Sequence, residues 1–230
     1  SQLIDNRALG TRTYDPALLE RSGVAPERLP ELVDPTVPLG RVRPEVAAAL
    51  GLPEGVQVIP GITDSHAAAL AAGLGVPGRV GLAVGTTAVL LTPVDHLVAD
   101  LDHELLAMPG IDGRHLVSAE NGLAGRAVAH VLEGFVHARD ALGDHRATDP
   151  FDGFDEALAA SPPGARGVRF LPWPAGSMAP QADPAMRGGF VGVSLDTERI
   201  DLVRAAAEGV AHNVRRLLGP LEVATAQAVD

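Results

Sequence analysis

One carboxylate stands at a position where chemistry often takes place. Asp64 follows the apolar stretch 56–59 and precedes the small-residue run 67–72. This order predicts that Asp64 lies in the connection between a short strand and a helix. Open α/β sheets usually present their ligand-binding groups in such connections. The alternative is structural, because an aspartate before a helix is more often an N-cap. From the residues alone, both interpretations of Asp64 stay open.

A second candidate is the tripeptide Gly85-Thr86-Thr87. Apolar stretches on both sides predict two short strands, so the tripeptide is expected at the tip of a hairpin. Its backbone N–H groups and two hydroxyls could cradle a phosphate, and Gly85 would let an oxygen approach closely. A Gly-Thr-Thr sequence is more often only a turn, and this alternative also stays open.

The elements that must position these residues alternate between strands and helices, which predicts an α/β fold. We expect helices within residues 15–32, at 44–50 closed by Gly51, at 67–72 with tight packing, at 124–135, and at 201–218. Strands are expected at 56–59, where the side chains should be buried, and at 80–84, 88–91, 116–119 and 168–171. In the last helix, the apolar residues that share one face are Val203, Ala207, Val210, Val214 and Leu217.

Composition excludes several classes of function. The 230 residues carry a formal net charge of −11, which disfavours nucleic acid and anionic membranes as partners and favours a small molecule. All basic residues are arginine, so a Walker P-loop with its lysine cannot exist in this sequence. There is no cysteine, no long apolar span and no signal-peptide pattern. We expect a soluble, cytoplasmic protein that binds neither nucleic acid nor membrane.

Other patterns favour structure over chemistry. Glycines 73, 75 and 78 match a dinucleotide fingerprint in letters, but they follow a helix and precede a strand, so we expect a turn. The eight histidines form no His-Glu-x-x-His pair, and no metal site is expected. His66 is a minor candidate for substrate contact. Trp173 is expected to pack, and Glu208 to form an exposed pair with Arg204 one helical turn away.

The order of these motifs resembles the FGGY family of carbohydrate kinases. Gly61-Ile62-Thr63-Asp64, an alanine-rich helix, Gly78 and Gly85-Thr86-Thr87 follow one another as in that family. The most specific match is Gly188-x-Phe190-x-Gly192-Val193, then seven residues, then Asp201-Leu202-x-x-Ala205-Ala206-Ala207-Glu208. Phe170-Leu171-Pro172, Asp183-Pro184 and Arg187-Gly188 agree as well. The resemblance covers nearly the whole chain.

The resemblance implies the fold of actin, sugar kinases and heat-shock ATPases, a ribonuclease H-like fold with two related α/β domains around a cleft. Residues 1–76 would be the C-terminal part of a first, sugar-binding domain, and residues 77–230 the N-terminal part of a second, nucleotide-binding domain. Asp64 would be the general base that accepts the proton of a sugar hydroxyl, and His66 would contact the sugar. Gly85, Thr86 and Thr87 would bind the phosphates of ATP. Mg²⁺-ATP and a ketose such as xylulose would be the ligands.

The sequence departs from the family pattern at four places, one of which is Ala207, where a larger apolar residue is usual. It has no Asp-Gly-Thr loop of the kind that contributes to the Mg²⁺ site in relatives, and no Gly-Gly-Gly-x-x-Ser loop. Gly176-Ser177-Met178 stands where many relatives carry Gly-Glu-Arg. We therefore expect a fragment that lacks both ends of the family pattern and is inactive by itself. A homodimer is one possible assembly. The alternative is a non-catalytic actin-like module that binds a nucleotide or a partner protein.

Overall fold

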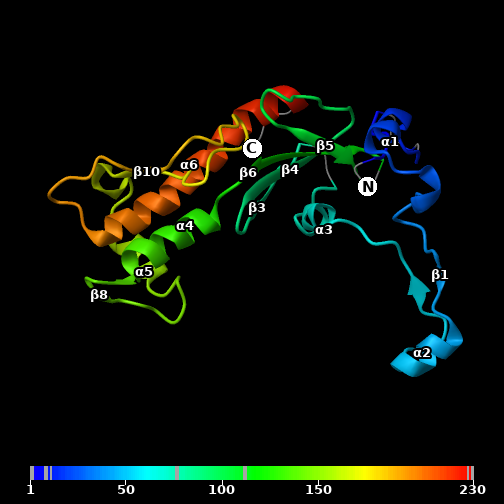
Figure 1. Ribbon diagram of the computed structural model, residues 1–230, viewed down its shortest axis with the longest axis horizontal. Coiled ribbons are helices and arrows are strands. Elements are labelled where there is room, and N and C mark those ends of the chain that lie inside the picture. Colours follow the sequence, from blue (N-terminus) through cyan, green and yellow to red (C-terminus); the bar gives the residue numbers. More distant parts are fainter. Residues whose placement is uncertain are drawn as a thin grey trace.

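The computed structural model describes residues 3–7, 10, 12–75, 78–110, 113–226 and 228. Figure 1 shows these residues as an arch, with a sheet near its middle, the long helix α6 (Arg199–Thr225) running towards one end, and an arm that carries α2 (Pro44–Leu50) at the other. Within the described part of the chain, no helix combines the length and the apolar character needed to cross a membrane.

The arm begins with two short helices whose ends were predictable. In α1 (Pro16–Ser22) the Asp15 carboxylate accepts hydrogen bonds from the first turn, and Gly23 closes the helix in the left-handed region at φ 65°. Gly51 ends α2 in the same way at φ 66°. A 3₁₀ turn (Pro26–Arg28) lies between them. Both expected helices are confirmed.

The strand before Asp64 differs from expectation. β2 (Gln57–Val58) pairs only over two residues with β1 (Gly40–Arg41). The side chains expected to be buried are open, with Val58 40% and Ile59 68% exposed. The prediction of a buried strand is wrong, because a two-residue ribbon has no second layer that could cover it.

The central sheet has four antiparallel strands in the order β3-β4-β6-β5. They are β3 (Gly81–Val84), β4 (Ala88–Val94), β6 (His115–Asn121) and β5 (Leu106–Pro109). Val84 lies opposite Ala88, so β3 and β4 form the expected hairpin with residues 85–87 at its tip. β5 was not predicted, since its four residues carry no strong periodicity.

Alternating residues of β4 serve two different layers, as the two-residue period of a strand requires. Leu90 packs in one core cluster with Leu217 and Leu221 of α6. Its neighbour Leu91 packs on the other face, in a cluster that contains Ala69 of α3 (Asp64–Ala71). The sheet therefore lies between α6 on one face and α3 on the other.

The remaining elements build the end of the arch around α6. They are α4 (Gly125–Val131), which continues as a π-helical turn (Leu132–Val136), the hairpin of β7 (Arg139–Asp140) and β8 (Gly143–Asp144), α5 (Phe154–Ala160), a 3₁₀ turn (Ala165–Gly167), β9 (Arg169–Leu171) and β10 (Gly189–Val191). Helices α4 and α5 and strand β9 all pack against α6. In the predicted apolar face of α6, Val203, Val210 and Leu217 are buried.

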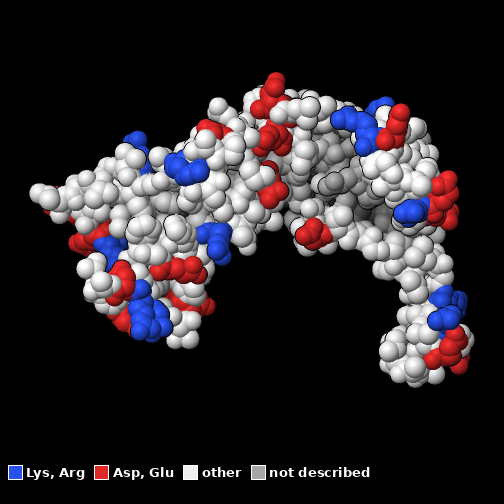
Figure 2. Space-filling view, in the orientation of Figure 1, with Lys and Arg blue, Asp and Glu red and all other residues white. Residues whose placement is uncertain are grey.

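The side of the sheet that carries α3 is only partly covered. In α3, Ala69 alone is buried, and Leu70 is 56% exposed, so the prediction of a tightly packed helix is wrong. Leu82 and Val84 of the edge strand β3 are also more than half exposed. Figure 2 shows that the middle of the concave side of the arch carries few charged side chains. A helix that touches the sheet along one line leaves most of its small residues open.

Candidate active site

Asp64 occupies the first turn of α3, and the residue before it caps the helix. Thr63 is the N-cap, and its hydroxyl accepts the backbone N–H of His66. This rules out the interpretation of Asp64 as the N-cap. Oδ1 of Asp64 accepts the N–H of Ser65 at 2.8 Å, the side chain is exposed, and Oδ2 has no hydrogen-bond partner among the described residues. One carboxylate oxygen is thus free to accept a proton or a ligand hydroxyl.

His66 ties the beginning of α3 to the sheet. Its Nε2 lies 2.7 Å from the carbonyl oxygen of Pro109, and its Nδ1 lies 2.6 Å from the hydroxyl of Thr63. A carbonyl can only accept, so Nε2 carries the proton and Nδ1 accepts from Thr63 in the neutral ring. Both ring nitrogens are therefore engaged by the protein, and no local pattern of residues indicates these contacts.

The hairpin tip is held from behind by the beginning of α4. The carbonyl of Gly85 accepts the N–H of Gly125 at 2.8 Å, and the carbonyl of Thr86 accepts the N–H of Ala124 at 2.9 Å. The N–H of Gly85 is used within the tip, at 2.8 Å from the carbonyl oxygen of Thr87. The N–H groups and hydroxyls of Thr86 and Thr87 have no partner within the described chain. Four donors thus remain available on a fixed turn.

Gly125 makes this support possible, and sequence analysis missed it. A Cβ on Gly125 would lie 2.5 Å from the carbonyl oxygen of Gly85, far inside ordinary contact. Only glycine lets the helix backbone approach the tip this closely. The only hint in the sequence is a glycine at the second position of the helix expected at 124–135.

The structure does not bring the two predicted sites into contact. The tip lies at the Ala88 end of β4, opposite Asn121 of β6. His66 binds Pro109, which pairs with His115 at the other end of β6. Asp64 and the tip are therefore attached to opposite ends of the sheet, although α3 packs on the face of β4. A ligand that used both would have to extend along that face.

Other carboxylates are engaged in local structure. Asp140 and Asp144 bind the N–H of Leu142 and the guanidinium of Arg146 in and beside the β7–β8 hairpin. Within the described ranges, no three His, Asp or Glu side chains gather closely enough to hold a metal ion. Of the three glycines expected in a turn, 73 and 78 have positive φ, whereas residues 76 and 77 lie outside the described part.

Glu208 forms the predicted pair with Arg204 at 2.8 Å, but the pair is not exposed as expected. The two side chains are 20% and 28% exposed, and Glu208 also accepts the N–H of Gly164. Arg204 donates in addition to the carbonyls of Leu158 and Ser161. The pair therefore joins α5 and the following turn to α6, which sequence spacing alone could not indicate.

Known proteins with similar sequences are sugar and polyol kinases. A glycerol kinase from Alkalilimnicola ehrlichii is 30% identical over 224 residues, which is 94% of this chain and 41% of that protein. A gluconokinase from Bacillus subtilis is 24% identical over 201 residues, 87% of this chain and 39% of that protein. The crystal structure of a xylulose kinase from Rhodospirillum rubrum matches with a TM-score of 0.73 and 27% identity, covering 94% of this chain and 42% of that one.

The chain thus spans about two fifths of the length of these relatives. The fold predicted from the resemblance, that of the actin-like sugar kinases, is confirmed by the structural match. Two family models match in the expected order: the N-terminal domain of the FGGY family of carbohydrate kinases over residues 6–71, and its C-terminal domain over residues 81–230. The chain belongs to the FGGY family of carbohydrate kinases.

Proposed function

We propose that this chain takes part in the ATP-dependent phosphorylation of a sugar hydroxyl, with Asp64 as general base and the tip at Gly85, Thr86 and Thr87 as a phosphate-binding loop. The observation that carries the proposal is the fixed hairpin tip. The amides of α4 occupy its carbonyl oxygens, so its unpaired N–H groups and hydroxyls are the donors that a phosphate oxygen would use. Family membership gives the reaction class.

Asp64 would act on the attacking hydroxyl. Its Oδ2 would accept the proton as the sugar oxygen attacks the γ-phosphoryl group, while Oδ1 stays fixed by the N–H of Ser65. Phosphoryl transfer needs positioning and charge neutralisation more than covalent help. The exposed position of Asp64 at the beginning of α3 suits contact with a ligand on the open side of the sheet.

His66 would have a positioning role. Because both of its ring nitrogens are bound by protein groups, we propose that it anchors the beginning of α3 to β5, and that its contact with sugar is at most through the ring edge. This arrangement would fix the direction of the Asp64 side chain.

Mg²⁺ would neutralise charge on the phosphates of ATP during transfer. The described residues offer no cluster of three carboxylates or histidines for it. The free donors of the tip fit phosphate oxygens, whereas the metal would be held mainly by phosphate and water, as is usual for Mg²⁺. Asp64 is the one carboxylate in the proposed site.

A ketose such as xylulose is our proposed substrate. The relatives named above act on glycerol and gluconate by their names, and the solved structure is named a xylulose kinase. We also propose the division of the chain into residues 1–76 and 77–230, with sugar and ATP bound between them. The family matches over residues 6–71 and 81–230 support this division.

A coupled assay of ADP release tests the proposal. We would assay the 230-residue chain, and any longer protein that contains it, with Mg²⁺-ATP and a panel of xylulose, ribulose, gluconate and glycerol. Asp64→Asn should lower sugar-stimulated release by about 10²–10⁴-fold, the range that a general base contributes. Asp155→Asn is the matched control, since Asp155 is an exposed aspartate in the first turn of α5.

The outcomes separate the enzyme from the alternative. Normal turnover by Asp64→Asn would refute the role of Asp64. In a longer protein that contains the chain, ATP binding without stimulation by any sugar would favour a non-catalytic actin-like module. We expect the 230-residue chain by itself to turn over poorly, because its sequence holds only one of the family's two phosphate loops.

A further inference from the structure

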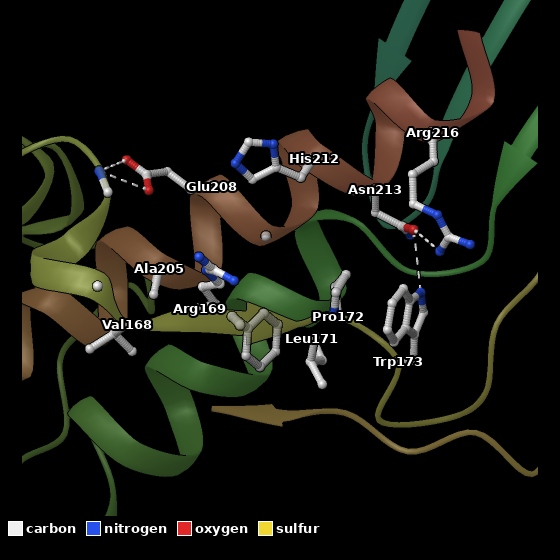
Figure 3. A pocket seen from close by; sticks show the side chains of 14 residues that line it. Val168, Arg169, Leu171, Pro172, Trp173, Ala205, Glu208, His212, Asn213 and Arg216 are labelled. Carbon is white, nitrogen blue, oxygen red and sulfur yellow. Dashed lines mark hydrogen bonds between the residues drawn. The ribbon is translucent and has the colours of Figure 1, made fainter. Parts of the chain in front are cut away.

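A cavity of about 500 Å³ lies between β9 with the loop that follows it and the outer side of α6. Figure 3 shows Arg169 pointing from β9 towards the part of α6 that carries Glu208 and His212, with Trp173 at the other end of the cavity. None of the residues around it belongs to the hairpin tip or to α3. The cavity is therefore separate from the proposed catalytic site.

The base of the cavity is the close contact between Gly209 of α6 and strand β9. A Cβ on Gly209 would lie 2.4 Å from the carbonyl oxygen of Phe170, so the strand rests directly on the backbone of α6. The side chains of neighbouring residues must then stand outwards on both sides of this contact. The walls are formed by long side chains of the strand and of the helix.

The charge of the cavity is opposite to that of the chain. Arg169, His212 and Arg216 line it, and neither arginine has a carboxylate partner among the described residues. Glu208 is the single acidic residue in the lining, and its charge is offset by Arg204 at 2.8 Å and by the N–H of Gly164 at 3.0 Å. Two guanidinium groups without a carboxylate partner among the described residues thus line one cavity of a chain whose net charge is −11.

One end of the cavity is a fixed aromatic wall. The indole N–H of Trp173 donates to Oδ1 of Asn213 at 3.3 Å, and Asn213 is 6% exposed. The guanidinium carbon of Arg216 lies 5.3 Å from the centre of the indole ring, within cation–π range. The ring is thus held from two sides, and the apolar surfaces of Leu171 and Pro172 continue the wall.

We propose that this cavity binds a small organic anion. Its phosphate or carboxylate group would lie between Arg169 and His212, where a guanidinium fork can donate two parallel hydrogen bonds. Its apolar part would pack against Leu171, Pro172 and the indole of Trp173. Pockets for small ligands combine an apolar lining with a few placed polar groups in this way. The site lies outside the machinery proposed for phosphoryl transfer.

Trp173 makes the proposal directly measurable, since it is the only tryptophan of the chain. We would titrate the protein with phenyl phosphate and with benzoate, and use benzyl alcohol as the neutral analogue, following tryptophan fluorescence and calorimetric heat. We expect saturable binding of at least one anion and none of benzyl alcohol. The two anions distinguish a phosphate site from a carboxylate site.

Two variants locate the anionic group. Arg169→Gln should weaken binding about tenfold or more, the effect of losing one charge-assisted hydrogen bond. Arg215→Gln is the matched control, because Arg215 is an exposed arginine of α6 that does not line the cavity. Its affinity should equal that of the unmodified protein.

Three results would overturn the proposal. They are no saturable binding of either anion, equal binding of benzyl alcohol, or equal affinity of Arg169→Gln and Arg215→Gln. Far-UV circular dichroism of each variant checks that it is folded. If Arg169→Gln is not folded, Arg169→Lys takes its place, and loss of the bidentate fork should still weaken binding.

Discussion

Replacing Gly125 by alanine should loosen the hairpin tip and lower the free energy of unfolding. The added Cβ would lie 2.5 Å from the carbonyl oxygen of Gly85, so the beginning of α4 and the tip must move apart by about 1 Å to restore ordinary contact. This movement lengthens the hydrogen bonds from Gly125 to Gly85, now 2.8 Å, and from Ala124 to Thr86, now 2.9 Å. The four donors of the tip would then lose their fixed arrangement.

The magnitude follows from three contributions. Two weakened hydrogen bonds cost about 1 kcal/mol each, and inserting a methyl group into a packed contact costs about 1–3 kcal/mol. Alanine recovers up to about 1 kcal/mol through its better helix propensity. The net expectation is a loss of about 2–5 kcal/mol. In a protein that binds ATP through this loop, the affinity for ATP should fall as well.

Urea unfolding followed by circular dichroism measures this change, and two other glycines serve as controls. Gly134→Ala meets nothing within 4 Å, so its stability should be unchanged or raised by up to about 1 kcal/mol. Gly122→Ala meets Sδ of Met178, the far end of a flexible side chain that can move aside, so its cost should be smaller than that of Gly125→Ala. If Gly125→Ala were as stable as Gly134→Ala, the close support of the tip would be refuted.

The free energy of unfolding should fall as acid protonates the fully buried Asp201. Burial raises the pKa of Asp201, but the Ser161 hydroxyl, the Glu198 N–H and the Arg166 guanidinium outweigh it, so the folded-state pKa lies below the ordinary value. This stabilisation is complete above the unfolded-state pKa of about 4 and is lost as the pH falls through the folded-state value. The free energy of unfolding of Asp201→Asn should therefore fall less steeply with decreasing pH than that of the unmodified protein. His66→Phe removes the hydrogen bond between α3 and Pro109 and should lower the free energy of unfolding in urea by about 1–2 kcal/mol. An unchanged free energy would show that this hydrogen bond does not stabilise the fold. Arg204→Ala should cost about 2–3 kcal/mol, because the carbonyls of Leu158 and Ser161 lose their partner, and an unchanged thermal midpoint would contradict this.

Local elements were predictable where the residues themselves set the backbone. Helix α2 begins at Pro44, whose ring fixes φ for a first helical turn, and ends at Gly51, which adopts positive φ without strain. The turn at residues 85–87 and the strands beside it followed from one glycine between two apolar stretches. Such features depend on neighbours in sequence, and the structure confirmed them.

Burial was the property that the sequence predicted badly. Val58 and Ile59 have the composition of a buried strand, yet both are open, and the alanines of α3 are mostly open as well. Whether an apolar residue is covered depends on which element lies over it, and that element can be far away in the chain. The short strand β5 was missed for a related reason, because its pairing with β6 supplies the regularity that its own four residues lack.

By itself the sequence determined the family and the two groups expected to do chemistry, Asp64 and the tip at Gly85. Both rest on residue types and on their order along the chain. Only the tertiary structure decided what surrounds them: His66 meets a carbonyl 43 residues away, and Gly125 meets the tip 40 residues behind it. The cationic cavity at Arg169 likewise exists only because β9 rests on a glycine of α6. Contacts between distant segments depend on packing in three dimensions, which no local pattern of residues specifies.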